Sequence, residues 1–174
     1  SFTILLALGS MPLAFTYPLM KRFTYWPQLF LGITFNYGLI LGWTSIHEEI
    51  SLIPILFYVG AIFWTLGYDT IYGFQDINDD EIIGLKSTSI KFKSNPYFFL
   101  VTCYFILFLI IIFLGILNKF NMMYFFFTIL IAYHLFYFQL KKVNLNNPSS
   151  CLDCFKSNNI FGFLVLSGIV IGKI

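Results

Sequence analysis

The most regular feature of the chain is the alternation of long apolar segments with shorter polar connections. A helix that crosses a bilayer needs about 20 predominantly apolar residues. Residues 105–113, Phe-Ile-Leu-Phe-Leu-Ile-Ile-Ile-Phe, lack the alternating polarity of a membrane-spanning strand. The pattern therefore predicts an all-α, multi-pass transmembrane bundle with six helices, over residues 1–16, 27–43, 52–68, 96–117, 122–140 and 158–174.

The composition excludes a water-soluble domain. Of the 174 residues, 59% are apolar and 10% are charged, whereas a typical soluble domain has about 45–50% and about 25%. The mean hydropathy is +0.83. Three cysteines are too few for a disulfide scaffold, and a net charge of +2 gives no basic surface for nucleic acid. The sequence therefore predicts a lipid bilayer, and no nucleic acid, as a partner.

The basic residues predict which helix ends lie together. If all six segments cross the membrane, the connections 17–25, 69–95 and 141–157 fall on one side. The positive-inside rule places that side in the cytoplasm or an equivalent compartment, because these connections hold eight of the ten basic residues: Lys21, Arg22, Lys86, Lys91, Lys93, Lys141, Lys142 and Lys156.

Acidic residues gather in one of these connections, where residues 69–81 hold five of the eight: Asp69, Asp76, Asp79, Asp80 and Glu81. If the third helix continues beyond residue 68, a rotation of about 100° per residue gives one face to Asp69, Tyr72, Gly73, Asp76 and Asp80. Like charges at this spacing destabilise a helix unless something neutralises them. Because Mg²⁺ binds one or two carboxylates together with substrate phosphates, the cluster predicts a metal–phosphate site. A hydrated loop, or a loop that binds Ca²⁺, stays open.

Residues of suitable chemistry follow the cluster. Gly84 can end a helix. Lys86 can then fold back toward a phosphate, with Ser87 and Thr88 as hydroxyl donors. The alternative is that Lys86 is one more basic residue of the membrane edge, and spacing alone does not decide between the two.

Two stretches resemble a known family of membrane enzymes. The first comprises Tyr68-Asp69-Thr70-Ile71-Tyr72, Asp76-Ile77-Asn78-Asp79-Asp80 and Gly84-Leu85-Lys86-Ser87-Thr88. It resembles the second aspartate motif of the UbiA-type intramembrane aromatic prenyltransferase superfamily. The second stretch is similar to the 4-hydroxybenzoate polyprenyltransferase branch, and it reads Tyr17-Pro18-Leu19-Met20-Lys21-Arg22-Phe23-Thr24, then Pro27-Gln28. The resemblance covers essentially the whole chain.

The resemblance implies a bundle of about nine transmembrane helices, of which this chain supplies about the last six. It implies that a polyprenyl group passes from polyprenyl diphosphate to the ring carbon beside the phenol of 4-hydroxybenzoate, a step of ubiquinone synthesis. Mg²⁺ would be bound through the diphosphate, with Asp76, Asp79 and Asp80 as its protein ligands. A bacterial inner membrane or the mitochondrial inner membrane is the implied location.

The same resemblance gives roles to further residues. Asp69, Tyr68 and Tyr72 would contact the substrates, the tyrosines through their ring faces on an allylic cation. Arg22 would bind either the diphosphate or the carboxylate of the acceptor, and Lys86 would bind phosphate. The implied catalytic set is Asp76, Asp80, Arg22 and Lys86.

The first aspartate motif of the family, Asn-Asp-x-x-Asp-x-x-x-Asp, has no counterpart in the chain. The chain also begins without methionine or a basic leader. We therefore expect residues 1–174 to form a single membrane-embedded domain of an N-terminally truncated enzyme, and to be inactive by themselves.

Three other classes of protein are alternatives to this one. A prenyltransferase for another acceptor, such as homogentisate or a naphthoate, would share the motifs. An ion-coupled transporter would place its ionisable groups near the midplane of the membrane, whereas these acids lie at one edge. A structural subunit would explain the helices but not the aspartates. Among the other polar residues, Cys151 and Cys154 lack further zinc ligands, and His134 is expected to pack within the bundle.

Overall fold

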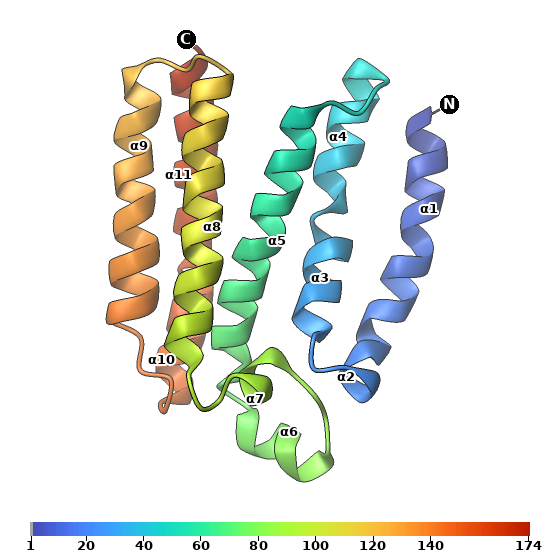
Figure 1. Ribbon diagram of the computed structural model, residues 1–174, viewed down its shortest axis with the longest axis vertical. Helices are drawn as coiled ribbons and strands as arrows, with labels where there is room; N and C mark the ends of the chain where they lie inside the picture. Colours follow the sequence, from blue (N-terminus) through green and yellow to red (C-terminus); the bar gives the residue numbers. More distant parts are fainter. Residues whose placement is uncertain (1) are drawn as a thin grey trace.

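The structure is built from long helices that run along a common axis. The computed structural model describes residues 2–174, so Ser1, which the first predicted helix includes, lies outside the described residues. Six helical segments are long and apolar enough to cross a membrane: Phe2–Phe23, Pro27–His47, Leu52–Gly73, Pro96–Leu117, Met122–Lys141 and Pro148–Lys173. Residues 2–174 contain no strand. The predicted all-α, multi-pass bundle is confirmed (Figure 1).

Several of these spans consist of consecutive helices. The first contains α1 (Phe2–Thr16), the 3₁₀ turn η1 (Tyr17–Leu19) and α2 (Met20–Phe23), and the second contains α3 (Pro27–Phe35) and α4 (Tyr37–His47). The third and fourth are single helices, α5 (Leu52–Gly73) and α8 (Pro96–Leu117), separated by α6 (Ile77–Ile83) and α7 (Thr88–Lys91). The fifth joins α9 (Met122–Ala132) to the π-helix η2 (Tyr133–Lys141), and the sixth joins α10 (Pro148–Lys156) to α11 (Asn158–Lys173).

The first span is longer than predicted. The connection expected over residues 17–25 is reduced to residues 24–26, because the helix continues to Phe23. Lys21 and Arg22 therefore lie in the last helical turn, where positive side chains interact favourably with the helix dipole. Hydropathy alone missed this turn because its polar residues reach beyond the apolar layer.

The connection predicted over residues 141–157 contains a helix as well. The side chain of Asn147 accepts a hydrogen bond from the backbone N–H of Ser149 at 3.0 Å, which caps α10 at its start. Pro148 occupies the first turn, where its missing N–H costs nothing. The polar composition of α10 hid it from a search for apolar segments.

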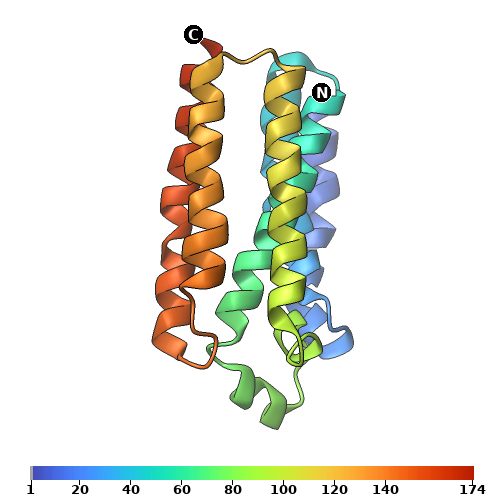
Figure 2. The ribbon, with the colours of Figure 1, turned by 60° about the vertical axis from the view of Figure 1, so that its left-hand side comes forward.

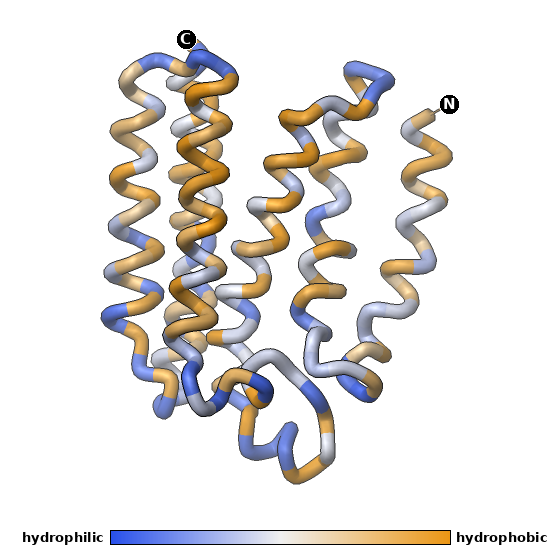
Figure 3. Tube along the Cα trace, in the orientation of Figure 1, coloured by the Kyte–Doolittle hydropathy of each residue, from blue (hydrophilic) through white to orange (hydrophobic). Residues whose placement is uncertain are grey.

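Polar residues concentrate at the two ends of the bundle, and apolar residues fill its length (Figure 3). At the end opposite the chain termini, the three predicted basic connections meet. The backbone N–H of Lys86 donates to the carbonyl of Lys21 (2.8 Å), and the hydroxyl of Tyr97 donates to the carbonyl of Val143 (3.3 Å). Helix α6 lies beyond the ends of the long helices there (Figure 2), and α7 packs against the last turns of α5.

Helix α5 is the central element, because it packs against α3, α4, α8 and α10. Gly67 lets α8 approach closely, since a Cβ atom at this position would overlap the ring of Tyr104. The hydroxyl of Tyr104 donates a hydrogen bond to the side-chain oxygen of Gln139. The side-chain amino group of Gln139 in turn donates to the side-chain oxygen of Asn158 at 2.7 Å. Trp64 on α5 donates to the same Asn158 oxygen at 2.8 Å. This chain of polar side chains, which is fully buried at Tyr104 and Gln139, joins four helices and links α5 to the others.

Candidate active site

A polar pocket of about 210 Å³ opens at the end of the bundle where the basic connections meet. The first span contributes Tyr17, Pro18 and Lys21, and α3 contributes Pro27, Gln28 and Leu31. The remaining lining comes from α5 and the segment that follows it: Asp69, Tyr72, Gly73, Asp76, Asp80, Lys86 and Ser87.

The third helix does continue beyond residue 68, but it does not extend through the whole acidic segment. Helix α5 ends at Gly73, where Phe74 and Gln75 donate to carbonyls three residues back (3.1 and 2.9 Å), and α6 begins at Ile77. Such bonds tighten the last turn of a helix. The five residues predicted to share a face nevertheless all line the pocket: Asp69, Tyr72, Gly73, Asp76 and Asp80.

Asp76 and Asp80 lie at the start of α6, joined by a backbone hydrogen bond of 3.0 Å from the N–H of Asp80 to the carbonyl of Asp76. Acidic residues are favourable in a first helical turn, which offsets part of their mutual repulsion. Burial raises the pKa of Asp80, the charge of Lys21 lowers it, and the charges of Asp76 and Asp79 raise it further. The net rise of the Asp80 pKa therefore comes first from burial, and Asp76 and Asp79 add to it.

Two lysines bring positive charge to the same pocket. Gly84 ends α6 in the left-handed conformation (φ 79°), as predicted, and the chain then turns back toward the bundle. The Lys86 ammonium donates to the carbonyl of Phe23 at 3.3 Å and lies 5.6 Å from the centre of the Tyr25 ring. Lys86 lines the pocket together with Lys21, while its ammonium group contacts Phe23 and Tyr25 at the pocket's edge.

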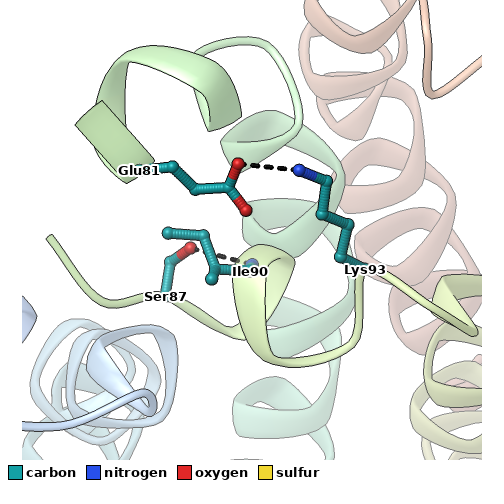
Figure 4. Close-up of polar contacts among 4 residues, drawn as sticks. All are labelled: Glu81, Ser87, Ile90 and Lys93. Atoms are coloured by element: carbon teal, nitrogen blue, oxygen red, sulfur yellow. Dashed lines mark hydrogen bonds and ion pairs between the residues drawn. The ribbon is translucent and has the colours of Figure 1, made fainter. Parts of the chain in front are cut away.

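Two polar contacts lie around the connection that carries Lys86 and Ser87 (Figure 4). The carboxylate of Glu81 pairs with the ammonium of Lys93 at 2.7 Å. Ser87 caps α7, because its hydroxyl oxygen accepts a hydrogen bond from the backbone N–H of Ile90 at 3.2 Å. The ion pair links α6 to the residue that follows α7, although an exposed pair contributes little free energy, and the Ser87 cap defines where α7 begins.

The structure does not bring every predicted site residue to the pocket. Arg22 and Asp79 are exposed and outside its lining. Tyr68 packs between Trp64 and Phe155, with ring centres 5.1 and 5.6 Å away. Five of the predicted site residues do line the pocket: Asp69, Tyr72, Asp76, Asp80 and Lys86.

Three polar lining residues were not predicted as site residues: Tyr17, Lys21 and Gln28. Helical spacing could have predicted the first two, because Tyr17 and Lys21 are four residues apart and such residues share a face of a helix. Arg22 is one residue further and is turned away from that face by about 100°. Gln28 belongs to the stretch that resembles the 4-hydroxybenzoate branch, but the resemblance gave it no role. Its place in the pocket depends on a contact with Thr88, far along the chain.

The donor set of the pocket fits Mg²⁺ that arrives with a diphosphate. In residues 2–174 no group of three or more histidine, cysteine, aspartate or glutamate side chains could hold a metal by itself. Asp76 and Asp80 do line one pocket, and Mg²⁺ binds one or two carboxylates and completes its shell with water and substrate phosphates. These two aspartates are the residues that could hold it.

A second cavity, of about 230 Å³ and almost wholly apolar, lies between α4, α5, α8 and α11. A row of aromatic rings leads to it from the polar pocket. Tyr72 of the pocket lies 4.6 Å from Phe155, Phe155 lies 5.6 Å from Tyr68, and Tyr68 lies 5.1 Å from Trp64. Because Trp64 lines the apolar cavity, the two cavities share one aromatic wall.

The fold and the pocket together define a multi-pass helical membrane protein with a charged pocket at one end of the bundle and an apolar cavity within it. The model of the UbiA prenyltransferase family matches residues 1–165. The chain belongs to this family.

Curated relatives agree with this assignment. The chain is 39% identical over 175 residues to a protein of Dictyostelium discoideum named 4-hydroxybenzoate polyprenyltransferase, mitochondrial. It is 37% identical over 174 residues to the proteins of the same name from Bos taurus and Homo sapiens. These matches cover 99% of this chain but 37% of the Dictyostelium protein and 47% of the other two. The chain thus spans less than half the length of these relatives.

A solved structure has the same fold. It is the apo structure of a UbiA homolog from Aeropyrum pernix K1, with a TM-score of 0.78 and 23% sequence identity. The match covers 98% of this chain and 64% of that chain.

Proposed function

We propose that this chain carries part of the active site of an enzyme that transfers a polyprenyl group from polyprenyl diphosphate to 4-hydroxybenzoate, a step of ubiquinone biosynthesis. The observation that carries the proposal is the pocket itself. It joins three carboxylates, Asp69, Asp76 and Asp80, to two lysines, Lys21 and Lys86, beside an apolar cavity. The names of the curated relatives support this choice of substrates.

The first chemical step is ionisation of the donor. The bond between the first prenyl carbon and the diphosphate oxygen breaks, and both electrons leave with the diphosphate. Lys21 and Lys86 stabilise the charge of that leaving group. Mg²⁺ bound through the diphosphate supplies Lewis-acid stabilisation of the same charge, and Asp76 and Asp80 would hold it.

The second step forms the carbon–carbon bond. The ring carbon beside the phenol donates an electron pair to the allylic cation, and that ring carbon then loses its proton. Tyr72 is one of two tyrosines that line the pocket, with Tyr17, and it can stabilise a cation through its ring face. Asp69 lines the pocket from α5, and we assign to its carboxylate the acceptance of the proton.

The prenyl chain would lie along the aromatic wall and in the apolar cavity. That cavity offers an apolar lining that excludes water from the allylic cation. A multi-pass membrane protein suits such a substrate, because the rest of a long prenyl chain can extend into the bilayer. We place the pocket on the cytoplasmic or equivalent side of a bacterial or mitochondrial inner membrane, since the basic residues gather there.

Because the chain spans less than half of its curated relatives, we propose that it does not turn over by itself and needs the first aspartate motif from elsewhere. The test is a chimera that joins this chain to the part of the bovine relative that it does not cover. Membranes with the chimera should prenylate 4-hydroxybenzoate in the presence of Mg²⁺. Membranes with the chain alone should not. Faster prenylation of homogentisate or a naphthoate would contradict the proposed acceptor.

A further inference from the structure

Gln28 is a buried polar side chain in the wall of the pocket. It stands in the first turn of α3 and is 7% exposed. Its side-chain oxygen Oε1 accepts a hydrogen bond from the backbone N–H of Thr88 at 3.0 Å. A backbone N–H can only donate, so the atom that faces it is the oxygen of the amide. This contact fixes the orientation of the Gln28 amide.

With Oε1 facing Thr88, the amino group Nε2 faces α5 at Gly73. A Cβ atom at Gly73 would lie 3.6 Å from Nε2, so the absence of that side chain leaves the amino group open to the pocket. Among residues 2–174, Gln28 makes its side-chain hydrogen bond through Oε1, and none is formed through Nε2. Nε2 is also not one of the fully buried polar atoms that lack a partner, so this donor is accessible from the pocket and available to an oxygen atom of a ligand.

The partner of Gln28 is itself held firmly. The hydroxyl of Thr88 shares a hydrogen bond of 2.6 Å with the hydroxyl of Thr70 on α5, and both side chains are fully buried. Ser89 adds a second bond of 2.8 Å from its hydroxyl to the carbonyl of Thr70. These hydrogen bonds attach the start of α7 to α5. Because Thr88 in turn orients the Gln28 amide, the Nε2 donor is held in place before any substrate binds.

We infer that Gln28 is a substrate-binding residue whose Nε2 donates to a substrate oxygen, either of the diphosphate or of the carboxyl or phenol group of the aromatic acceptor. The inference rests on the proposed function and adds a residue to it. A neutral amide suits this place because the pocket already holds Lys21 and Lys86 together with three aspartates. It adds a directed hydrogen bond without changing the balance of charge.

Two substitutions separate binding from a purely structural role. Gln28→Glu keeps an oxygen for the N–H of Thr88 and replaces the donor Nε2 by a second oxygen, whereas Gln28→Met removes both groups. Binding of inorganic diphosphate with Mg²⁺, and of 4-hydroxybenzoate, is measured separately on the purified chimera. The thermal unfolding midpoint is recorded for each variant.

Both variants should bind the same one of the two ligands about tenfold more weakly, as expected for the loss of one hydrogen bond, while Gln28→Glu unfolds at the wild-type temperature. The ligand affected identifies the substrate oxygen. If both variants bind both ligands like the wild type, Gln28 only supports Thr88 and the inference is wrong. A defect in Gln28→Glu alone would be charge repulsion and would also overturn it. If the wild-type chimera binds neither ligand, the proposed function fails, and the inference fails with it.

Discussion

The backbone N–H of Lys86 donates a hydrogen bond to the backbone carbonyl of Lys21 over 2.8 Å. This bond joins the end of the first span to the connection behind α6, two segments far apart in the sequence. It places both lysines at the pocket that Asp69, Asp76 and Asp80 also line. The lysines and aspartates that we propose to bind a metal diphosphate therefore meet where two backbone segments are paired directly.

Lys21 should matter more to the donor substrate than its neighbour Arg22, because Lys21 lines the pocket and Arg22 does not. A charge-assisted hydrogen bond is worth about 1.5–3 kcal/mol, so Lys21→Ala should raise the KM for polyprenyl diphosphate by about 10- to 100-fold. Arg22→Ala is the matched control in the same helical turn. Steady-state kinetics of the chimera would refute this assignment if Arg22→Ala gave the larger defect.

The activity of the chimera should fall in acid as Asp80 takes up a proton, because only the ionised carboxylate binds a metal. Asp79 is one of the charges that raise the pKa of Asp80. Asp79→Asn should therefore lower that pKa and move the acid side of the pH profile of kcat/KM to lower pH. Glu81→Gln, also on α6 but not a cause of that shift, should leave the profile in place. A profile that moves to higher pH in Asp79→Asn would contradict the assigned charges.

The close contact between α5 and α8 should be sensitive to one methyl group. In Gly67→Ala the new Cβ overlaps the buried ring of Tyr104, and overpacking of this kind costs about 1–3 kcal/mol. Gly42→Ala is the control, because no atom lies within 4 Å of its added Cβ. Thermal unfolding in detergent should show a lower midpoint for Gly67→Ala alone. Equal midpoints would mean that α8 does not approach α5 as described.

The apolar cavity should discriminate prenyl donors by length. Gly162 lines it and has no atom within 4 Å of an added Cβ, so Gly162→Phe places a ring in the cavity without displacing a neighbour at the point of attachment. Turnover of a long-chain polyprenyl diphosphate should fall well below that of a two-isoprene donor. Gly9→Phe, at an equally open position outside that cavity, should leave the ratio unchanged. An unchanged ratio in Gly162→Phe would place the prenyl chain elsewhere.

Much of the fold could be predicted from the sequence, because a long apolar segment without alternating polarity can cross a bilayer as a helix but not as a barrel strand. The helix ends could not. The turn with Lys21 and Arg22, and the whole of α10, are polar helical segments whose pattern looks like a connection. Their helical state depends on capping by Asn147 and on continuity with the apolar helices, which hydropathy does not measure.

For the pocket, helical periodicity grouped Asp69, Tyr72, Asp76 and Asp80 correctly although the helix breaks between them. The break changes the path of the backbone, but α6 returns to the same side of α5. Gln28 stands in a stretch that resembles the family, but its place in the pocket could not be predicted, because it depends on a hydrogen bond to Thr88, 60 residues away. Local patterns carry no information about such a contact.

The most direct test of the account is transfer of a radiolabelled prenyl group to 4-hydroxybenzoate by the chimera, compared with its Asp76→Asn and Asp80→Asn variants at equal protein abundance. We predict lipid-extractable product in the presence of Mg²⁺ and none after the metal is chelated. Either variant should form at least about 100-fold less product, since each loses a negative charge that would hold the metal diphosphate. Asp79→Asn, outside the pocket lining, should keep most of the activity. Wild-type turnover in Asp76→Asn and Asp80→Asn would contradict the claim that this pocket is the site of diphosphate ionisation.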